Sequence, residues 1–163
     1  MADVKKDPLY EPLDPDFELL EKLNAQLKEE PTDGRLWYEK GMQHVWANQN
    51  DEAIKSFSRG LFYDPFHARM RFWRARKLMG KGAYIFSAAE MKLAAALLPY
   101  DAEIQYYTGV NLYLANMLPE AKEAHSRCRE LILKGQKKLT LPATVDWYWT
   151  ICMKLGEPEE AKR

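Results

Sequence analysis

The chain has 163 residues, a length that suits one domain. Apolar residues make up 47% and aromatic residues 12%, enough to fill a core, which argues against a disordered chain. Basic and acidic residues number 24 each, so the formal net charge is zero and overall charge argues against a nucleic-acid partner.

Residues 1–15 contain three prolines and alternating charge, which predict an extended lead-in. They lack the apolar stretch of a secretory signal, and no apolar run in the chain approaches the length of a membrane span. The two cysteines, Cys128 and Cys152, do not make a disulfide framework. We therefore expect a cytoplasmic, reduced protein with no membrane partner.

Helical periodicity begins at Asp16, which can cap a helix running to about Glu30. Apolar residues then recur every three to four positions: Phe17, Leu20, Leu23 and Leu27. The pattern ends at Pro31. A helix of about 35–47 should follow, and Asn48, Gln49 and Asn50 should form a turn. We expect Asp51 to cap the next helix, which runs to about Phe62.

The remaining chain repeats this organisation. Gly80 and Gly82 predict a turn within residues 68–101, and a basic linker follows Lys134. Pro142 then begins a helix that runs to about Leu155 and is apolar on more than one face. Residues 157–161 are typical of the start of one more helix.

The prolines carry a longer period, because Pro31, Pro65 and Pro99 stand thirty-four residues apart. That period is typical of the tetratricopeptide repeat, a pair of helices closed by a proline. Six residues match the fourth, eighth, twentieth, twenty-fourth, twenty-seventh and thirty-second positions of that repeat: Trp37, Gly41, Ala53, Phe57, Gly60 and Pro65. The chain therefore resembles a tetratricopeptide-repeat (TPR) protein over most of its length.

The resemblance implies an all-α fold, a right-handed α-α superhelix of about seven helices. The competing fold is a compact helical bundle. We expect one domain over residues 16–163, divided as follows: a capping half repeat at 16–33, repeats at 34–67, 68–101 and 102–135, and a partial fourth repeat or capping helix at 142–163. The second repeat departs from the family pattern, since Arg71 and Arg74 stand where large apolar residues are usual.

The family's inward-facing positions imply a partner-binding groove. Twelve residues are candidates for its lining: Arg35, Tyr38, Met42, Val45, Trp46, Arg69, Phe72, Arg76, Met79, Tyr106, Val110 and Tyr113. Glu103, Leu114, Asp146, Thr150 and Met153 occupy further inward positions. Aromatic residues, methionine and arginine are enriched at protein interfaces. The alternative is that a helix of the same chain, 16–30 or 142–155, fills the groove.

The expected partner is a protein or peptide segment, and Arg69 and Arg76 would select an acidic or carboxylate group on it. The clamp used by TPR proteins that grip chaperone tails is absent, because Tyr38 and Met42 replace its lysine and asparagine. No acid occurs from residue 65 to 89, a span with six basic residues: Arg69, Arg71, Arg74, Arg76, Lys77 and Lys81. We interpret this basic band as a protein-facing surface, not a nucleic-acid site, that the acidic N-terminal region could neutralise.

Catalytic motifs such as GxSxG, the P-loop, GxGxxG and HExxH do not occur. His125 and Cys128 are three apart on one helix, but zinc needs more ligands and Cys152 is the only other cysteine. We therefore expect no cofactor, no metal and no enzyme activity.

The functional prediction is a non-catalytic protein–protein interaction module: an adaptor, scaffold or chaperone. The named alternative is a chaperone of the type III secretion translocator class with three such repeats. An enzyme or metal-binding protein on a helical scaffold is the rival class. We also expect the apolar helix at 142–155 to be covered by a second copy, a partner or a continuation of the chain.

Overall fold

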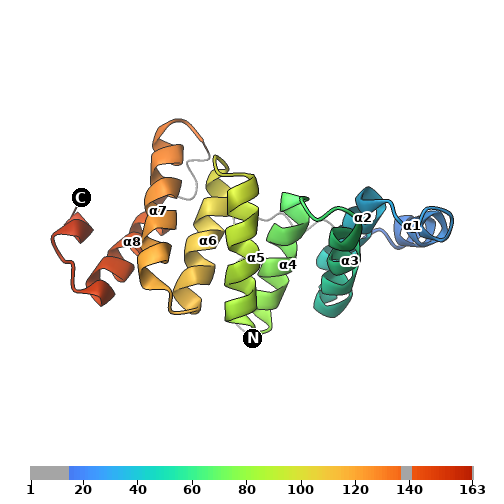
Figure 1. Ribbon diagram of the computed structural model, residues 1–163, viewed down its shortest axis with the longest axis horizontal. Coiled ribbons are helices and arrows are strands. Elements are labelled where there is room, and N and C mark those ends of the chain that lie inside the picture. The colour runs from blue at the N-terminus through green and yellow to red at the C-terminus, as the bar shows by residue number, and fades with distance from the viewer. Residues whose placement is uncertain (1–14, 137–140, 163) are drawn as a thin grey trace.

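The computed structural model describes residues 15–136 and 141–162. Within these ranges the chain forms eight α-helices and one short 3₁₀ turn, with no strand (Figure 1). The elements are α1 (Phe17–Glu29), α2 (Gly34–Trp46), α3 (Asn50–Tyr63), α4 (Ala68–Gly80), α5 (Tyr84–Leu97), α6 (Ala102–Leu114), α7 (Leu118–Leu133), α8 (Leu141–Leu155) and η2 (Glu160–Lys162). The predicted all-α class is confirmed, with one helix more than expected. The lead-in predicted for residues 1–15 lies, apart from Pro15, outside the described residues.

Short polar side chains set the starts of the helices whose first-turn N–H groups they satisfy. The Asp16 carboxylate accepts a hydrogen bond from the Leu19 backbone N–H, as its position predicted. Asp33 and Asp101 cap α2 and α6 in the same way. The expected cap of α3 is wrong: the helix begins one residue before Asp51, which therefore lies inside the first turn. In the first turn, its negative charge is still stabilised by the positive end of the helix dipole.

Three helix pairs reverse direction through the same backbone geometry. Asn48, Gly82 and Asn116 have φ values of 55°, 76° and 60° and stand thirty-four residues apart. Glycine and asparagine tolerate this left-handed region better than other residues. The hairpins α2–α3, α4–α5 and α6–α7 therefore have the same type of turn. The second helix start expected at residues 157–161 is instead the 3₁₀ turn η2.

Glycine lets the two helices of a hairpin approach closely. A Cβ atom added at Gly41 would lie 2.3 Å from the Phe57 ring, and one at Gly109 would lie 2.4 Å from the His125 ring. Both distances are shorter than any real carbon contact, so the ring occupies the space that only glycine leaves open.

The core is continuous along the chain because every apolar cluster joins two or more consecutive helices. Phe57 of α3 packs with Val45 of α2 and Met70 of α4. The next cluster joins α4, α5 and α6, and a third joins α5, α6, α7 and α8. Each hairpin is thus held by its neighbours, as expected of a stacked repeat.

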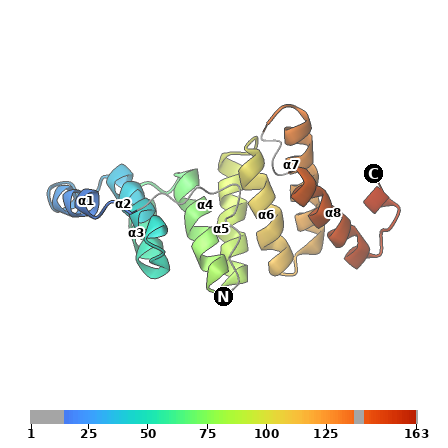
Figure 2. The ribbon, with the colours of Figure 1, turned by 180° about the vertical axis from the view of Figure 1, so that it is seen from behind.

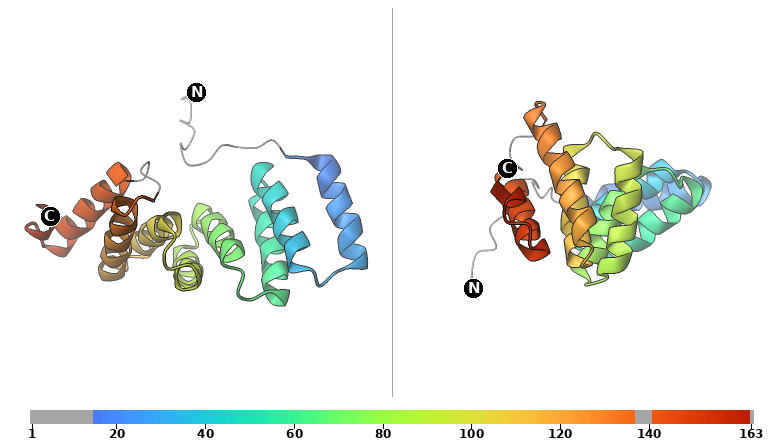
Figure 3. Two further views of the ribbon diagram at one scale, coloured as in Figure 1. Left: turned by 90° about the horizontal axis from the view of Figure 1, so that it is seen from above. Right: turned by 60° about the vertical axis from the view of Figure 1, so that its left-hand side comes forward.

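The helices form a curved row with α1 and α8 at its two ends (Figure 3). Besides their sequence neighbours, α4 and α6 contact each other, as do α6 and α8. On a curved row, alternate helices touch on the shorter, inner side. Figure 1 looks onto α5 and α7, and Figure 2, from behind, shows α8 in front of α7. We call the side formed by α2, α4, α6 and α8 the inner face. None of the described helices is long and apolar enough to cross a bilayer.

Candidate interaction surface

One side of α6 forms the centre of the inner face. Four residues share that side at helical spacing: Glu103, Tyr106, Val110 and Tyr113. Glu103 reaches α4, where its carboxylate lies 3.0 Å from Arg69. Tyr113 packs edge-on against Trp147 of α8, with ring centroids 5.0 Å apart. Tyr106, Val110 and Tyr113 are half-buried, so their side chains reach the surface.

Arg69 joins α4 to the start of α6. Its guanidinium lies 2.6 Å from Asp101 and 3.0 Å from Glu103. Two carboxylates of the same chain therefore neutralise a residue that we expected to select an acidic group on a partner.

Arg76, two turns further along α4, lies against aromatic rings. Its guanidinium carbon is 4.3 Å from the ring centroid of Tyr107 and 4.8 Å from that of Trp73. Such cation–π contacts hold the guanidinium in place over the rings. Burial lowers the pKa of the adjacent Lys77, and the charge of Arg76 lowers it further. Lys77 makes no ion pair with a described residue, so its ammonium adds a positive charge beside Arg76 and the rings that contact it.

Two expected lining residues are core residues instead. Phe72 is fully buried beneath the guanidinium groups of Arg69 and Arg76, whose centres lie 5.5 and 5.7 Å from its ring. An apolar ring gains most by sinking into the seam between α4, α5 and α6, where it packs against Met91 and Ile104. Val45, with 3% of its surface exposed, points into the cluster between α2, α3 and α4.

The α2 part of the inner face is aromatic. Tyr38, Met42 and Trp46 are half-buried and pack against the cluster beneath them. The Tyr38 ring stacks on His67, with centroids 4.9 Å apart. Burial raises the pKa of Tyr38 because it disfavours the phenolate. Arg35 is exposed at the start of the helix.

Other inward candidates lie at the rim. Met79 is half-buried near the end of α4, whereas Leu114, Asp146 and Met153 are exposed. Thr150 donates a hydrogen bond to the backbone carbonyl of Asp146.

Sequence reasoning did not place Trp73 and Tyr107 beside this surface, although both rings contact the guanidinium of Arg76. Trp73 and Tyr107 occupy the same position in successive repeats, thirty-four residues apart. That coincidence of large aromatic residues was the signal that could have found them.

The inner face is not filled by either helix suggested as an alternative. Leu23 and Leu27 of α1 pack against Leu36 of α2 at one end of the row. Helix α8 packs on α6 and α7 at the other end. Within the described part of the chain, the inner side of α4 is left to its own side chains and those of α2 and α6.

The basic band is largely paired within the chain. Arg71 and Arg74 converge on Glu90 of α5, at 3.1 and 2.6 Å, and all three side chains are mostly buried. Lys81 pairs with Asp51. Among the described residues, the acids that pair with the band come from α3, α5 and the start of α6. We expected the acidic N-terminal region to neutralise the band, and most of that region lies outside the described residues.

His125 and Cys128 are structural. The Cys128 thiol donates to the Ala102 carbonyl at 3.2 Å, and His125 is buried between the rings of Tyr106 and Trp147. Neither His125 ring nitrogen has a hydrogen-bond partner among the described residues, and burial lowers its pKa to about 4. In residues 15–136 and 141–162, no three histidine, cysteine or acidic side chains are grouped to hold a metal ion.

Solved structures share this architecture. YrrB, described as "a TPR protein with an unusual peptide-binding site", superposes with a TM-score of 0.78 over 89% of this chain and 72% of its own, at 16% identity. The fold is a tetratricopeptide-repeat superhelix. MamA matches it with a TM-score of 0.76 over 87% of this chain and 80% of its own, at 15% identity. No protein-family model matches the sequence, and no curated protein does.

A third structure, the first TPR of Spaghetti (RPAP3) bound to an HSP90 peptide, matches the TPR superhelix described here. Its TM-score is 0.66 over 76% of this chain and 94% of its own, at 21% identity. At identities this low, the superpositions establish the shared fold alone. The residues of the inner face must therefore be interpreted from this chain.

Proposed function

We propose that this TPR superhelix is a non-catalytic interaction module, acting as an adaptor, scaffold or chaperone, that binds a segment of a partner protein on its inner face. The observation that carries the proposal is the row of half-buried aromatic, methionine and valine side chains along α2, α4 and α6. Interfaces favour aromatic residues and methionine because such side chains offer a large contact area. The fold shared with YrrB and with the peptide-bound RPAP3 repeat supports this choice of function.

The side chain proposed to select an acidic group is Lys77, which lies beside Arg76. Arg69 is already engaged by Asp101 and Glu103, whereas Lys77 has no recorded acidic partner among the described residues. Burial lowers the pKa of Lys77, and an approaching carboxylate would raise it again. Binding of the carboxylate therefore favours the protonated lysine, and the protonated lysine favours binding. The proposed ligand is therefore a segment with apolar side chains and at least one acidic group.

The test uses a displayed library of random peptides, which requires no knowledge of the partner. Peptides selected on the parent protein should be enriched in acidic and aromatic or aliphatic residues. Val110→Glu places a charge in the middle of the inner face and should weaken their binding by about 2 kcal/mol or more. Leu93→Glu, on the opposite side of the molecule, is the matched control and should bind as the parent does.

Lys77→Gln tests the acid preference separately. It should weaken acidic peptides more than neutral ones, and the difference should shrink as salt is added. If Val110→Glu keeps the parent's affinity for every selected peptide while remaining folded, the inner face is not the binding surface.

The expected association through α8 also stays a proposal. Val145, Trp149 and Met153 recur every four residues and are all about half exposed, while Trp147 is tucked against Tyr113. Trp149→Glu should remove any association through this side. Cys128 and Cys152 are buried and form no disulfide, which supports a reducing, cytoplasmic location. The paired basic band supports a partner other than nucleic acid.

A further inference from the structure

The outer side of α5 is apolar, although it faces away from the core. Six of its exposed residues share one side of the helix: Ile85, Phe86, Ala89, Lys92, Leu93 and Ala96. Lys92 is the only charged residue among them, and Ile85 and Phe86 are 74% and 72% exposed. The neighbouring outer helices carry mostly charged residues on the same side: Asp51, Glu52, Lys55 and Arg59 on α3, where Phe62 is also exposed, and Glu123, Arg127 and Glu130 on α7. Soluble monomers rarely leave a continuous apolar surface of this kind exposed, so the outer side of α5 requires a cover.

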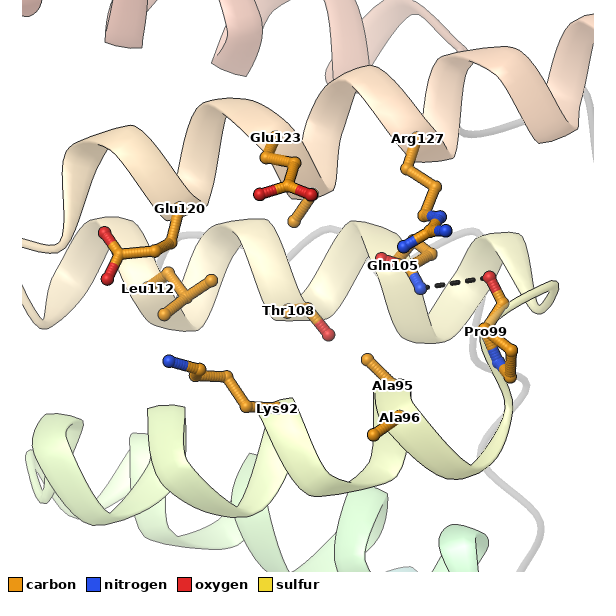
Figure 4. A pocket seen from close by; sticks show the side chains of 11 residues that line it. Lys92, Ala95, Ala96, Pro99, Gln105, Thr108, Leu112, Glu120, Glu123 and Arg127 are labelled. Atoms are coloured by element: carbon orange, nitrogen blue, oxygen red, sulfur yellow. Dashed lines mark hydrogen bonds between the residues drawn. The ribbon is translucent and has the colours of Figure 1, made fainter.

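A pocket of about 340 Å³ runs beside this surface, between α5 and α7 (Figure 4). Thr108 and Leu112 of α6 form its floor, and α5 contributes Lys92 and two alanines to one wall. Glu120 and Glu123 line the α7 wall, and no ion pair with a described residue is recorded for either.

The side chains of α5 are complementary in size to those of a second, antiparallel copy of the same helix. Large side chains stand at its start and small ones near its end, and Met91 lies midway. Phe86 and Ala96 are equally far from Met91, as are Ala89 and Leu93. Two copies of α5 packed antiparallel about Met91 would therefore set Phe86 against alanine and Leu93 against alanine. Large residues facing small ones interdigitate without voids.

We propose that a second copy of this chain covers the outer side of α5, packed antiparallel across a two-fold axis that passes at the level of Met91 along the helix, on the side away from its buried side chain. Such an isologous contact forms every favourable pair twice. It brings Lys92 of the second copy level with Glu123 at the pocket wall, so opposite charges meet at the edge of the apolar contact. The surface is distinct from the inner face, and the proposal does not depend on what the inner face binds.

Sedimentation velocity on the full chain, from nanomolar to high micromolar concentration, tests the proposal. The parent should be a dimer at the upper end. Leu93→Glu buries a charge in the contact and should weaken dimerisation by about a hundredfold or more. Val110→Glu, on the inner face, should leave the dimer intact, which separates this proposal from that of peptide binding.

A swap tests the register. Ala89→Leu alone sets leucine against leucine and Leu93→Ala alone leaves a void, so each should weaken the dimer about tenfold or more. The double variant Ala89→Leu/Leu93→Ala restores one large and one small residue in each pair and should recover most of the parent's affinity. Alanine and leucine are both strong helix formers, so the fold of α5 is preserved. A parent that is monomeric throughout, a dimer that survives Leu93→Glu, or a double variant no tighter than the weaker single variant would each overturn the proposal.

Discussion

Buried His125 should make the stability of the fold depend on pH. Burial lowers its pKa from the usual 6.5 to about 4, while the same ring in the unfolded chain keeps its ordinary value. Between these two values the unfolded chain binds a proton that the folded chain excludes. The stabilisation is therefore fully present above pH 6.5 and is lost as the pH falls toward 4. Each pKa unit is equivalent to about 1.4 kcal/mol, so the full effect is about 3 kcal/mol.

The measurement is urea unfolding at pH 7 and at about pH 4.5, where about 2 kcal/mol of this term should have been lost. Carboxylates titrate in the same range, so the parent must be compared with His125→Phe, which cannot titrate and whose ring suits a site between Tyr106 and Trp147. The free energy of unfolding of the parent should fall by about 2 kcal/mol more than that of the variant. Tryptophan fluorescence and circular dichroism must follow the same unfolding transition. Parallel dependences on pH in the two proteins would refute the reasoning.

Two further predictions concern packing and buried charge. Gly41→Ala should destabilise the fold by about 1–3 kcal/mol, because the new methyl group meets the Phe57 ring, whereas Gly80→Ala, with no atom nearby, should be neutral or slightly stabilising. Glu90→Gln leaves two mostly buried guanidinium groups without their carboxylate and should cost about 3–5 kcal/mol, against little for the exposed Glu52→Gln. Thermal unfolding of the four variants checks both, and equal losses within either pair would contradict the corresponding structural reason.

Periodicity explains why so much of the fold could be predicted from the sequence. A thirty-four-residue repeat of prolines, with glycine and aromatic residues at fixed offsets, specifies helix pairs that stack, and the structure has them. The Asp16 cap was predictable because its chemistry is local. The Asp51 cap was not, since α3 starts one residue earlier and places that carboxylate inside the helix.

The candidate surface was harder to predict because exposure depends on what covers each residue. Phe72 occupies an inward position of the repeat, yet Arg69 and Arg76 lie over its ring. Nothing local distinguishes it from Tyr106, which keeps an edge at the surface. The pairing of Arg71 and Arg74 with Glu90 was also hidden, because the acid lies just beyond the stretch without acids and reaches back across the hairpin.

The central claim, that the inner face binds a partner segment, is tested most directly by photo-crosslinking in the cells that make the protein. A photoreactive phenylalanine analogue at position 110 samples the inner face, and the same group at position 59 of α3 samples an exposed outer position. We predict covalent adducts to another protein from position 110 that the Lys77→Gln substitution diminishes, and no such adducts from position 59. Adducts to the same proteins from position 59, with none from position 110, would contradict the account.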